Sequence, residues 1–324
     1  MRTIPQLVTD IYGSLALLTA MQIDLFTPLG DGPLNIDDLA AKLDIAPNRL
    51  QRLVNLLIAE GLLMEQADGR LANGEEANRT LVKGRPHYRG GAHEAYTAAW
   101  SACLKTAESL SSGRPAAPLE FDGSDLERAK AVLRGLAPQA VSGATEMLKR
   151  LDLSSHHHLL DIGGGSGALS LSLLAALPGL TATVVDIPAI IPAAQEMLAE
   201  EPQADRCHIL AGDALQGPLP PHDLAVMRNF LQLFGPDDIR RALKTCRAAI
   251  APDGRLCVFG YVLDDDRRGP PMALGADMLF LNYYAEGAAY TRADYSSWLD
   301  EAGFTVAAMH SIPGGQTLIV AVPH

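Results

Sequence analysis

The chain contains 324 residues, more than one ordinary domain needs and fewer than three would take. Hydrophobic residues make up 48% and charged residues 20%, a globular balance that can bury a large core. The net charge of −12 repels phosphate backbones and anionic lipids, which argues against nucleic acid and membranes as partners. No apolar run approaches the roughly 18 residues of a membrane-spanning helix, and no signal peptide is recognisable. The four cysteines lack CxxC spacing, so we expect reduced thiols in a cytoplasmic protein.

The N-terminal part of the chain has the spacing of an all-helical module. Apolar residues recur at helical intervals over residues 4–25, and Asn35 is placed to cap a second helix. A third helix is expected after Pro47. Residues 62–71 then predict a short hairpin with Asp-Gly at its tip. Three helices followed by a hairpin are the pattern of a winged helix.

A winged helix suggests two functions, DNA binding or dimerisation. Arg49 and Arg52 would lie on the DNA-reading helix, but the segment is not basic overall and the whole chain is acidic. We therefore predict a winged-helix dimerisation domain over residues 1–85. Residues 86–324 are predicted to form a helical linker region and a cofactor-binding domain.

The linker region carries a group of aromatic residues. Tyr88, Tyr96 and Trp100 fall within a predicted helical stretch. They are compatible with a plain core and also with a pocket between the two domains, where small-molecule sites tend to form.

From Leu159 onward, short apolar strands alternate with helices. Strands are expected at 159–162, 181–186, 207–211, 223–227 and 255–261, with a helix at 168–177. This alternation predicts an α/β fold with a doubly wound, Rossmann-like parallel sheet. The last two strands, 304–310 and 316–322, are joined by a tight Pro-Gly-Gly turn and so must pair antiparallel. A parallel sheet with a terminal hairpin is the layout of the class I methyltransferase fold.

A glycine-rich loop follows the first strand of this sheet. It reads Asp161-Ile162-Gly163-Gly164-Gly165-Ser166-Gly167, at the edge where open sheets bind ligands. The glycines let the backbone turn sharply and approach a ligand closely. The loop fits a dinucleotide site and also a site for S-adenosylmethionine (SAM). We favour SAM, because Asp161 would attract the ammonium group of SAM and repel a pyrophosphate.

Three further residues extend this predicted cofactor site. Asp186 closes the second strand, where a carboxylate can accept both ribose hydroxyls. Asp213 follows the third strand and can meet the adenine amino group, or can simply cap a turn. Arg228 ends the fourth strand and can face the carboxylate of SAM. Gly163, Gly165 and Gly167 complete the predicted cofactor-binding set.

These features together resemble the class I SAM-dependent O-methyltransferases typified by the plant caffeic acid enzymes and the bacterial polyketide-tailoring enzymes. The resemblance covers nearly the whole chain and includes 161–167, 185–188, 212–213, 227–238, 299–304 and the final hairpin. It implies transfer of a methyl group to a small-molecule acceptor. It also implies a homodimer in which the N-terminal module dimerises and helps to cover the pocket of the partner.

The sequence departs from this family where the catalytic base is expected. Family members continue the fourth strand into a segment like Arg-Asn-Val-Leu-His-Asp-Trp, whose His removes the acceptor proton. Here Gln232 falls at the His position, and Ala289 falls where many relatives have a flanking Glu. A glutamine carboxamide has no useful pKa and cannot act as a general base near neutral pH.

Three explanations of this departure stay open. The acceptor can need no base, for example a thioether sulfur, a neutral amine or an ionised acid, so that Gln232 only orients it during direct in-line transfer. Another residue can supply the base. The protein can also bind SAM without transferring its methyl group. The residues considered as replacement bases are Tyr96, Tyr283, Tyr284, Tyr290, Glu286 and Asp277, and we take Tyr96 and Tyr284 with Gln232 as the catalytic candidates.

The remaining site predictions concern the acceptor and metals. The segment 277–284 is expected to line the acceptor pocket, although a buried core helix would have the same composition. The substrate-binding candidates are Trp100, Met278, Asn282 and Tyr283. No metal site is predicted, because the three consecutive histidines 156–158 cannot all face one ion from an extended chain. A SAM-sensing winged-helix regulator is the remaining alternative function.

Overall fold

The structure, a computed structural model, describes residues 2–85, 88–199 and 201–324. The chain forms two compact units, Met1–Thr97 and Ala98–His324. The first unit therefore extends past the expected domain end at residue 85. Residue 86, the expected start of the second domain, lies outside the described residues. The division falls within helix α6 (His93–Cys103).

The first unit contains the expected helices and hairpin. Asn35 caps α3 by accepting a hydrogen bond from the Asp38 N–H, and Pro47 opens α4. The hairpin pairs Leu63 with Asn73 in antiparallel register. The single helix predicted for 4–25 is instead two helices that meet at Asp10. The elements are α1 (Ile4–Thr9), α2 (Ile11–Gln22), α3 (Ile36–Leu43), α4 (Pro47–Ala59), β1 (Leu63–Glu65), β2 (Leu71–Asn73), α5 (Glu75–Thr80) and η1 (Gly90–Ala92).

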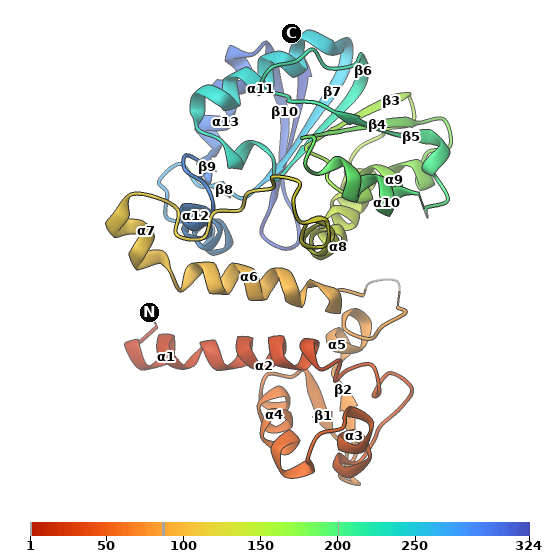
Figure 1. Cartoon of the computed structure of the whole chain (residues 1–324), viewed down its shortest axis with the longest axis vertical. Helices are drawn as coiled ribbons and strands as arrows, with labels where there is room; N and C mark the ends of the chain where they lie inside the picture. The colour runs from red at the N-terminus through yellow and green to blue at the C-terminus, as the bar shows by residue number, and fades with distance from the viewer. Residues whose placement is uncertain (1, 86–87, 200) are drawn as a thin grey trace. The chain divides into compact units, whose positions relative to one another are not determined.

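The second unit is built on a seven-stranded sheet with the order β10-β11-β7-β6-β3-β4-β5 (Figure 1). The pairs formed by β7, β6, β3, β4 and β5 are parallel, and β11 runs antiparallel to both β7 and β10. The predicted α/β fold with an antiparallel terminal hairpin is thereby confirmed. The strands are β3 (His158–Ile162), β4 (Thr181–Asp186), β5 (Cys207–Ala211), β6 (His222–Arg228), β7 (Ile250–Gly260), β10 (Phe304–Ser311) and β11 (Thr317–Pro323).

Helices cover both faces of this sheet, and two short strands pair beside it. The helical segments are α7 (Thr106–Ser112), α8 (Leu126–Arg150), α9 (Ala168–Ala176), α10 (Ile191–Leu198), η2 (Ala204–Arg206), η3 (Leu231–Leu233), α11 (Pro236–Ala249), α12 (Pro271–Tyr283) and α13 (Arg292–Glu301). The short strands β8 (Val262–Leu263) and β9 (Tyr290–Thr291) are parallel. No helix within the described residues is long and apolar enough to cross a membrane.

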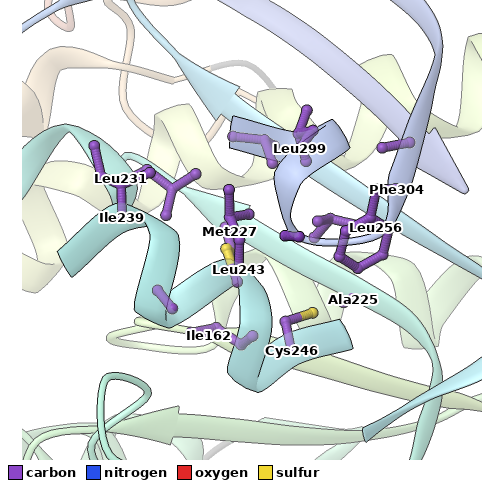
Figure 2. Close-up of a cluster of buried hydrophobic side chains, with 14 of the residues drawn as sticks. Ile162, Ala225, Met227, Leu231, Ile239, Leu243, Cys246, Leu256, Leu299 and Phe304 are labelled. Carbon is purple, nitrogen blue, oxygen red and sulfur yellow. The ribbon is translucent and has the colours of Figure 1, made fainter. Parts of the chain in front are cut away.

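Two apolar clusters hold these layers together. Figure 2 shows the cluster under α11 and α13, in which Ile162 and Met227 of the sheet meet Leu243 of α11. The other cluster buries Leu159 and Val226 together with residues of α8 and α9. Successive residues of a strand point to opposite faces, so each central strand contributes to both clusters. This burial on both faces explains why the strands are continuous apolar runs in the sequence.

Candidate cofactor and acceptor site

The glycine loop lies at the carboxyl end of β3, between the neighbouring strands β4 and β6. Gly163, Gly165 and Gly167 have φ angles of 67°, 54° and 70°, a region that other residues rarely adopt. The Gly163 N–H donates to the Val185 carbonyl at 2.8 Å. Strand order reverses at β3, which is where doubly wound sheets bind nucleotide-like ligands.

Asp161 lies beneath this loop. Its side chain is 1% exposed, and its Oδ2 accepts a hydrogen bond from Ser170 Oγ at 2.7 Å. The backbone of Gly164 lies directly against the carboxylate, because a Cβ atom added to this glycine would stand only 2.6 Å from Asp161 Cγ. Burial raises the pKa of Asp161 to about 6, and the nearby Arg228 charge opposes the rise. The carboxylate therefore supports the loop from below, and we expect its charge to act on a ligand through the loop.

Asp186 holds the other side of the loop. Its Oδ2 accepts from the Gly165 N–H at 2.9 Å, and its Oδ1 accepts from the Ile187 N–H at 2.8 Å. Burial raises the pKa of this carboxyl group, while the two backbone N–H groups oppose the rise. Each carboxylate oxygen keeps a lone pair beyond these bonds, as an acceptor of ribose hydroxyls requires.

Arg228 provides the main test of whether these residues fit SAM. Its side chain packs against α8, since a Cβ atom added to Gly143 of that helix would stand 3.6 Å from Arg228 Cδ. Its Nη1 is buried and has no hydrogen-bond partner within the described residues. Burial lowers the pKa of the guanidinium, and the Asp161 charge counteracts this. A buried cationic N–H without a partner is costly, and the carboxylate of SAM is an anion that would satisfy it.

Asp213 lies at the same edge but is already engaged in its own turn. The Gly212 N–H donates to the Asp186 carbonyl, which brings the segment beside β4. Asp213 Oδ1 accepts from the Leu215 N–H at 2.8 Å, and Oδ2 accepts from Gln216 Nε2 at 2.7 Å. The turn-capping role is thus present in the structure, and contact with adenine stays a prediction.

Gln232 lies in the 3-10 turn η3 directly after β6. It is 4% exposed, and its Oε1 accepts from the Tyr261 N–H at 3.4 Å. Tyr290 fixes the end of the same turn, because its hydroxyl donates to the Phe234 carbonyl at 2.5 Å. The carboxamide is therefore held by its oxygen, and no hydrogen bond joins its Nε2 to another described residue.

The tyrosines considered as replacement bases are poorly suited to that role. Burial raises the pKa of Tyr284 well above its usual range. Burial likewise raises the pKa of Tyr290 to about 12, and its hydroxyl already donates to a backbone carbonyl. The pKa of Tyr283 is also raised by burial. A phenol must be ionised to accept a proton, so these side chains cannot deprotonate an acceptor near neutral pH.

Asn282 and Met278, two of the acceptor-binding candidates on α12, differ in their surroundings. Asn282 is fully buried, its Oδ1 accepts from Ser109 Oγ at 2.7 Å, and its Nδ2 donates to Thr106 Oγ1 at 3.0 Å. The Asn282 amide thus joins α12 to α7 and engages both hydrogens of Nδ2 and one lone pair of Oδ1, and its contact with an acceptor stays a prediction. Met278, on the same helix, is 48% exposed.

The aromatic candidates of the linker region lie on α6. Tyr96 belongs to the first unit and Trp100 to the second, about one helical turn apart. Both are half-buried. Their place in an acceptor pocket stays a prediction.

Sequence reasoning missed several residues that shape the cofactor edge. Ser170 supports Asp161, as described above. Asn229 has a φ of 53°, and the Phe230 ring lies 2.5 Å from where a Cβ at Gly163 would stand. Asn is the residue type after glycine that most often takes this conformation, so Asn229 at a strand end was the available signal. Nothing in the sequence marks Ser170, which lies on α9 and donates a hydrogen bond to Asp161 of β3, nine residues earlier.

Comparisons with known proteins agree with this geometry. A family profile described as the O-methyltransferase domain matches residues 110–305. The tetracenomycin polyketide synthesis 8-O-methyl transferase TcmO of Streptomyces glaucescens is 31% identical, over 97% of this chain and 94% of its own. The N,N-dimethyltransferase OxyT of Streptomyces rimosus is 30% identical, over 99% of this chain and 96% of its own.

Solved structures show the same fold. Human N-acetylserotonin methyltransferase in complex with SAM superposes with a TM-score of 0.87 and 22% identity, covering 99% of this chain and 96% of that one. The resemblance inferred from the sequence is confirmed: the chain belongs to the O-methyltransferase domain family and is a SAM-dependent methyltransferase.

Proposed function

We propose that this enzyme methylates an oxygen atom of a small, polyketide-like aromatic acceptor that reaches the site already ionised. The family and the relative TcmO support oxygen as the methylated atom and a polyketide as the acceptor class. The observation that carries the proposal is the burial of Gln232, the carboxamide that the sequence resemblance assigns to the position of the family His. The neighbouring phenols have raised pKa values and cannot replace that base.

The residues of this chain have defined tasks in the proposed reaction. When bound, SAM would supply a methyl group on its sulfonium sulfur, and the acceptor oxygen would bond to that methyl as the C–S bond breaks and the thioether S-adenosylhomocysteine leaves. Asp186 would hold the ribose of SAM and Arg228 would hold its carboxylate, so the cofactor would be fixed on both sides of its sulfur. The Gln232 Nε2 donates a hydrogen bond to the acceptor oxygen and orients it without removing a proton. Proximity and alignment then supply most of the rate acceleration.

This mechanism predicts that the pH dependence follows the acceptor. Across a series of phenols and naphthols with different pKa values, the inflection of kcat/KM with pH should move with the pKa of each acceptor.

We expect Gln232→Leu, which nearly keeps the side-chain volume but cannot donate a hydrogen bond, to lower kcat/KM about tenfold without moving the inflection. We expect Gln232→His to extend activity to weakly acidic phenols, because an imidazole can take their proton.

Two results would contradict this mechanism. One is an inflection that stays at the same pH for every acceptor, which would show that a group of the enzyme is the base. The other is transfer to thioethers or amines but not to ionised phenols, which would assign the site to sulfur or nitrogen. Measuring product formation with one acceptor of each class distinguishes these outcomes.

We also propose that the enzyme is a homodimer formed through its N-terminal helices. Large apolar side chains recur at three- and four-residue intervals along α1 and α2 and are exposed by 40% to 78% of their surface. A continuous apolar stripe of this kind marks an interaction surface. The stripe consists of Ile4, Leu7, Val8, Ile11, Tyr12 and Leu15.

The dimer can be tested by sedimentation equilibrium. We expect the native protein to be a dimer at micromolar concentration and the double variant Leu7→Asp/Ile11→Asp to be a monomer, because buried aspartates would oppose association. Thr9→Asp adds a charge to an exposed position of α1 outside the stripe and should leave the dimer intact. A native monomer, or a double variant that still dimerises, would refute this interface.

A further inference from the structure

The C-terminal hairpin reaches the cofactor edge through one side chain. Gln316 lies in the turn before β11, and its Nε2 donates a hydrogen bond to Asn229 Oδ1 at 2.5 Å. Gln316 is 7% exposed, and its carbonyl accepts from the Ile312 N–H at 2.9 Å. The backbone of Gln316 is thus held by its own turn, and its side chain connects positions 87 residues apart.

Asn229, the partner of Gln316, has an unusual backbone conformation. Its φ of 53° lies in the left-handed region, which residues with a Cβ adopt only at an energetic cost. Its N–H still donates to the Phe259 carbonyl at 2.9 Å, so the bend occurs at the last rung of the β6–β7 ladder. A bend of this kind persists only where its surroundings hold it, and the Gln316 hydrogen bond is such a restraint.

The Asn229 bend lies between Arg228, whose charge acts on Asp161, and Phe230, whose ring lies against the glycine loop. Arg228 precedes it, and its buried Nη1 has no hydrogen-bond partner in the part of the chain that the structure describes. Phe230 follows it and places its ring against Gly163. Consecutive side chains of a regular strand point to opposite faces. Arg228 is the last residue of β6 paired with β7, and the left-handed Asn229 redirects the chain directly after it. The bend thus sets where Phe230 stands relative to the loop and restrains the strand end from which Arg228 projects.

We propose that Gln316 is a positioning residue that holds the Asn229 bend and thereby aims Arg228 at the carboxylate of SAM. Gln316 acts through Asn229 and does not itself touch the cofactor. The proposal rests on the role given to Arg228 under the proposed function. It assigns part of cofactor recognition to the antiparallel hairpin, outside the parallel strands that carry the loop.

The test compares SAM with 5′-methylthioadenosine, which has the adenosine and sulfur of SAM but no amino-acid carboxylate. Calorimetric Kd values would be measured for native protein and for Gln316→Met, which keeps the length of the side chain but cannot donate. We expect Gln316→Met to weaken SAM binding about tenfold, the size of one hydrogen bond to a charged group, and to change 5′-methylthioadenosine binding less than twofold. Ser311→Ala, at an exposed position of the same hairpin, should change neither Kd.

A double-mutant cycle tests the path through Asn229. Glycine adopts the left-handed conformation without cost and offers no side chain to Gln316. In an Asn229→Gly background, Gln316→Met should therefore weaken SAM binding by less than twofold. A full tenfold effect in that background would show that Gln316 acts by another route and would overturn the proposal.

Two results separate this proposal from the role of Arg228. If Arg228→Met lowers the preference for SAM over 5′-methylthioadenosine but Gln316→Met does not, only the positioning role of Gln316 fails. If Arg228→Met leaves the preference unchanged, the Arg228 assignment fails and the proposal fails with it. Equal weakening of both ligands by Gln316→Met would indicate a general loosening of the hairpin and would also overturn the proposal. Gln316→Ala provides a second variant if the methionine disturbs folding.

Discussion

An Asp186→Ala variant is expected to bind SAM about 100-fold more weakly than the native protein, because it loses a charged acceptor for two hydrogen bonds that the ribose hydroxyls would donate. The same change leaves the Gly165 and Ile187 N–H groups without their acceptor, which loosens the glycine loop. Both effects act in the same direction. Isothermal titration with SAM and S-adenosylhomocysteine measures the loss, and urea unfolding shows whether the variant is folded.

Asp213→Ala is the matched control for this prediction. It removes a carboxylate from the same edge of the sheet, but both oxygens of Asp213 already accept hydrogen bonds within its own turn. We expect SAM affinity to fall less than about tenfold, since at most one adenine contact is lost. Equal losses in Asp186→Ala and Asp213→Ala would contradict the distinct role of Asp186.

At pH 8, Asp161→Asn is expected to raise the free energy of unfolding by about 3 kcal/mol. Burial raises the pKa of Asp161 from 3.8 to about 6, so the native protein must hold an ionised carboxylate in an apolar environment. The unfolded chain ionises the same group at little cost. Asparagine has nearly the same shape and can still accept the Ser170 hydrogen bond, but it carries no charge.

The pH dependence of this gain has a definite sign. Because the folded-state pKa is the higher one, the penalty is absent below about pH 4, grows as the pH rises to about 6, and is constant above that. The difference in the free energy of unfolding between Asp161→Asn and native protein should therefore be about half as large at pH 5 as at pH 8. Urea unfolding of the cofactor-free protein at both pH values measures it. Asp205→Asn, at an exposed position, should change stability by less than about 0.5 kcal/mol. A variant less stable than native protein at pH 8 would refute the prediction.

Much of the fold could be predicted because its signals are local. The strand 181–186 has the bounds expected from its apolar run, since a strand covered on both faces admits few polar residues. The strand 207–211 at the sheet edge also has the expected bounds, although most of its residues are exposed or half-buried. Asn35 marks the start of α3 because a cap needs only a side chain within three residues. The break between α1 and α2 at Asp10 was missed, because the apolar spacing continues across it without a change.

The sequence alone determined the fold class and the SAM cofactor, because short runs of residues carry both. The contacts of the glycine loop and Asp186 with SAM, and the replacement of the family His by Gln232, stay predictions. Only the tertiary structure decided which polar side chains are free to act. The side-chain amide of Asn282 is hydrogen-bonded to Ser109 and Thr106. The buried Nη1 of Arg228, in contrast, has no hydrogen-bond partner among the described residues. Gln316 meets Asn229 only after the hairpin has paired. Hydrogen-bond partners and burial depend on contacts between residues far apart in the chain, and these contacts set both the pKa values and the availability of each group.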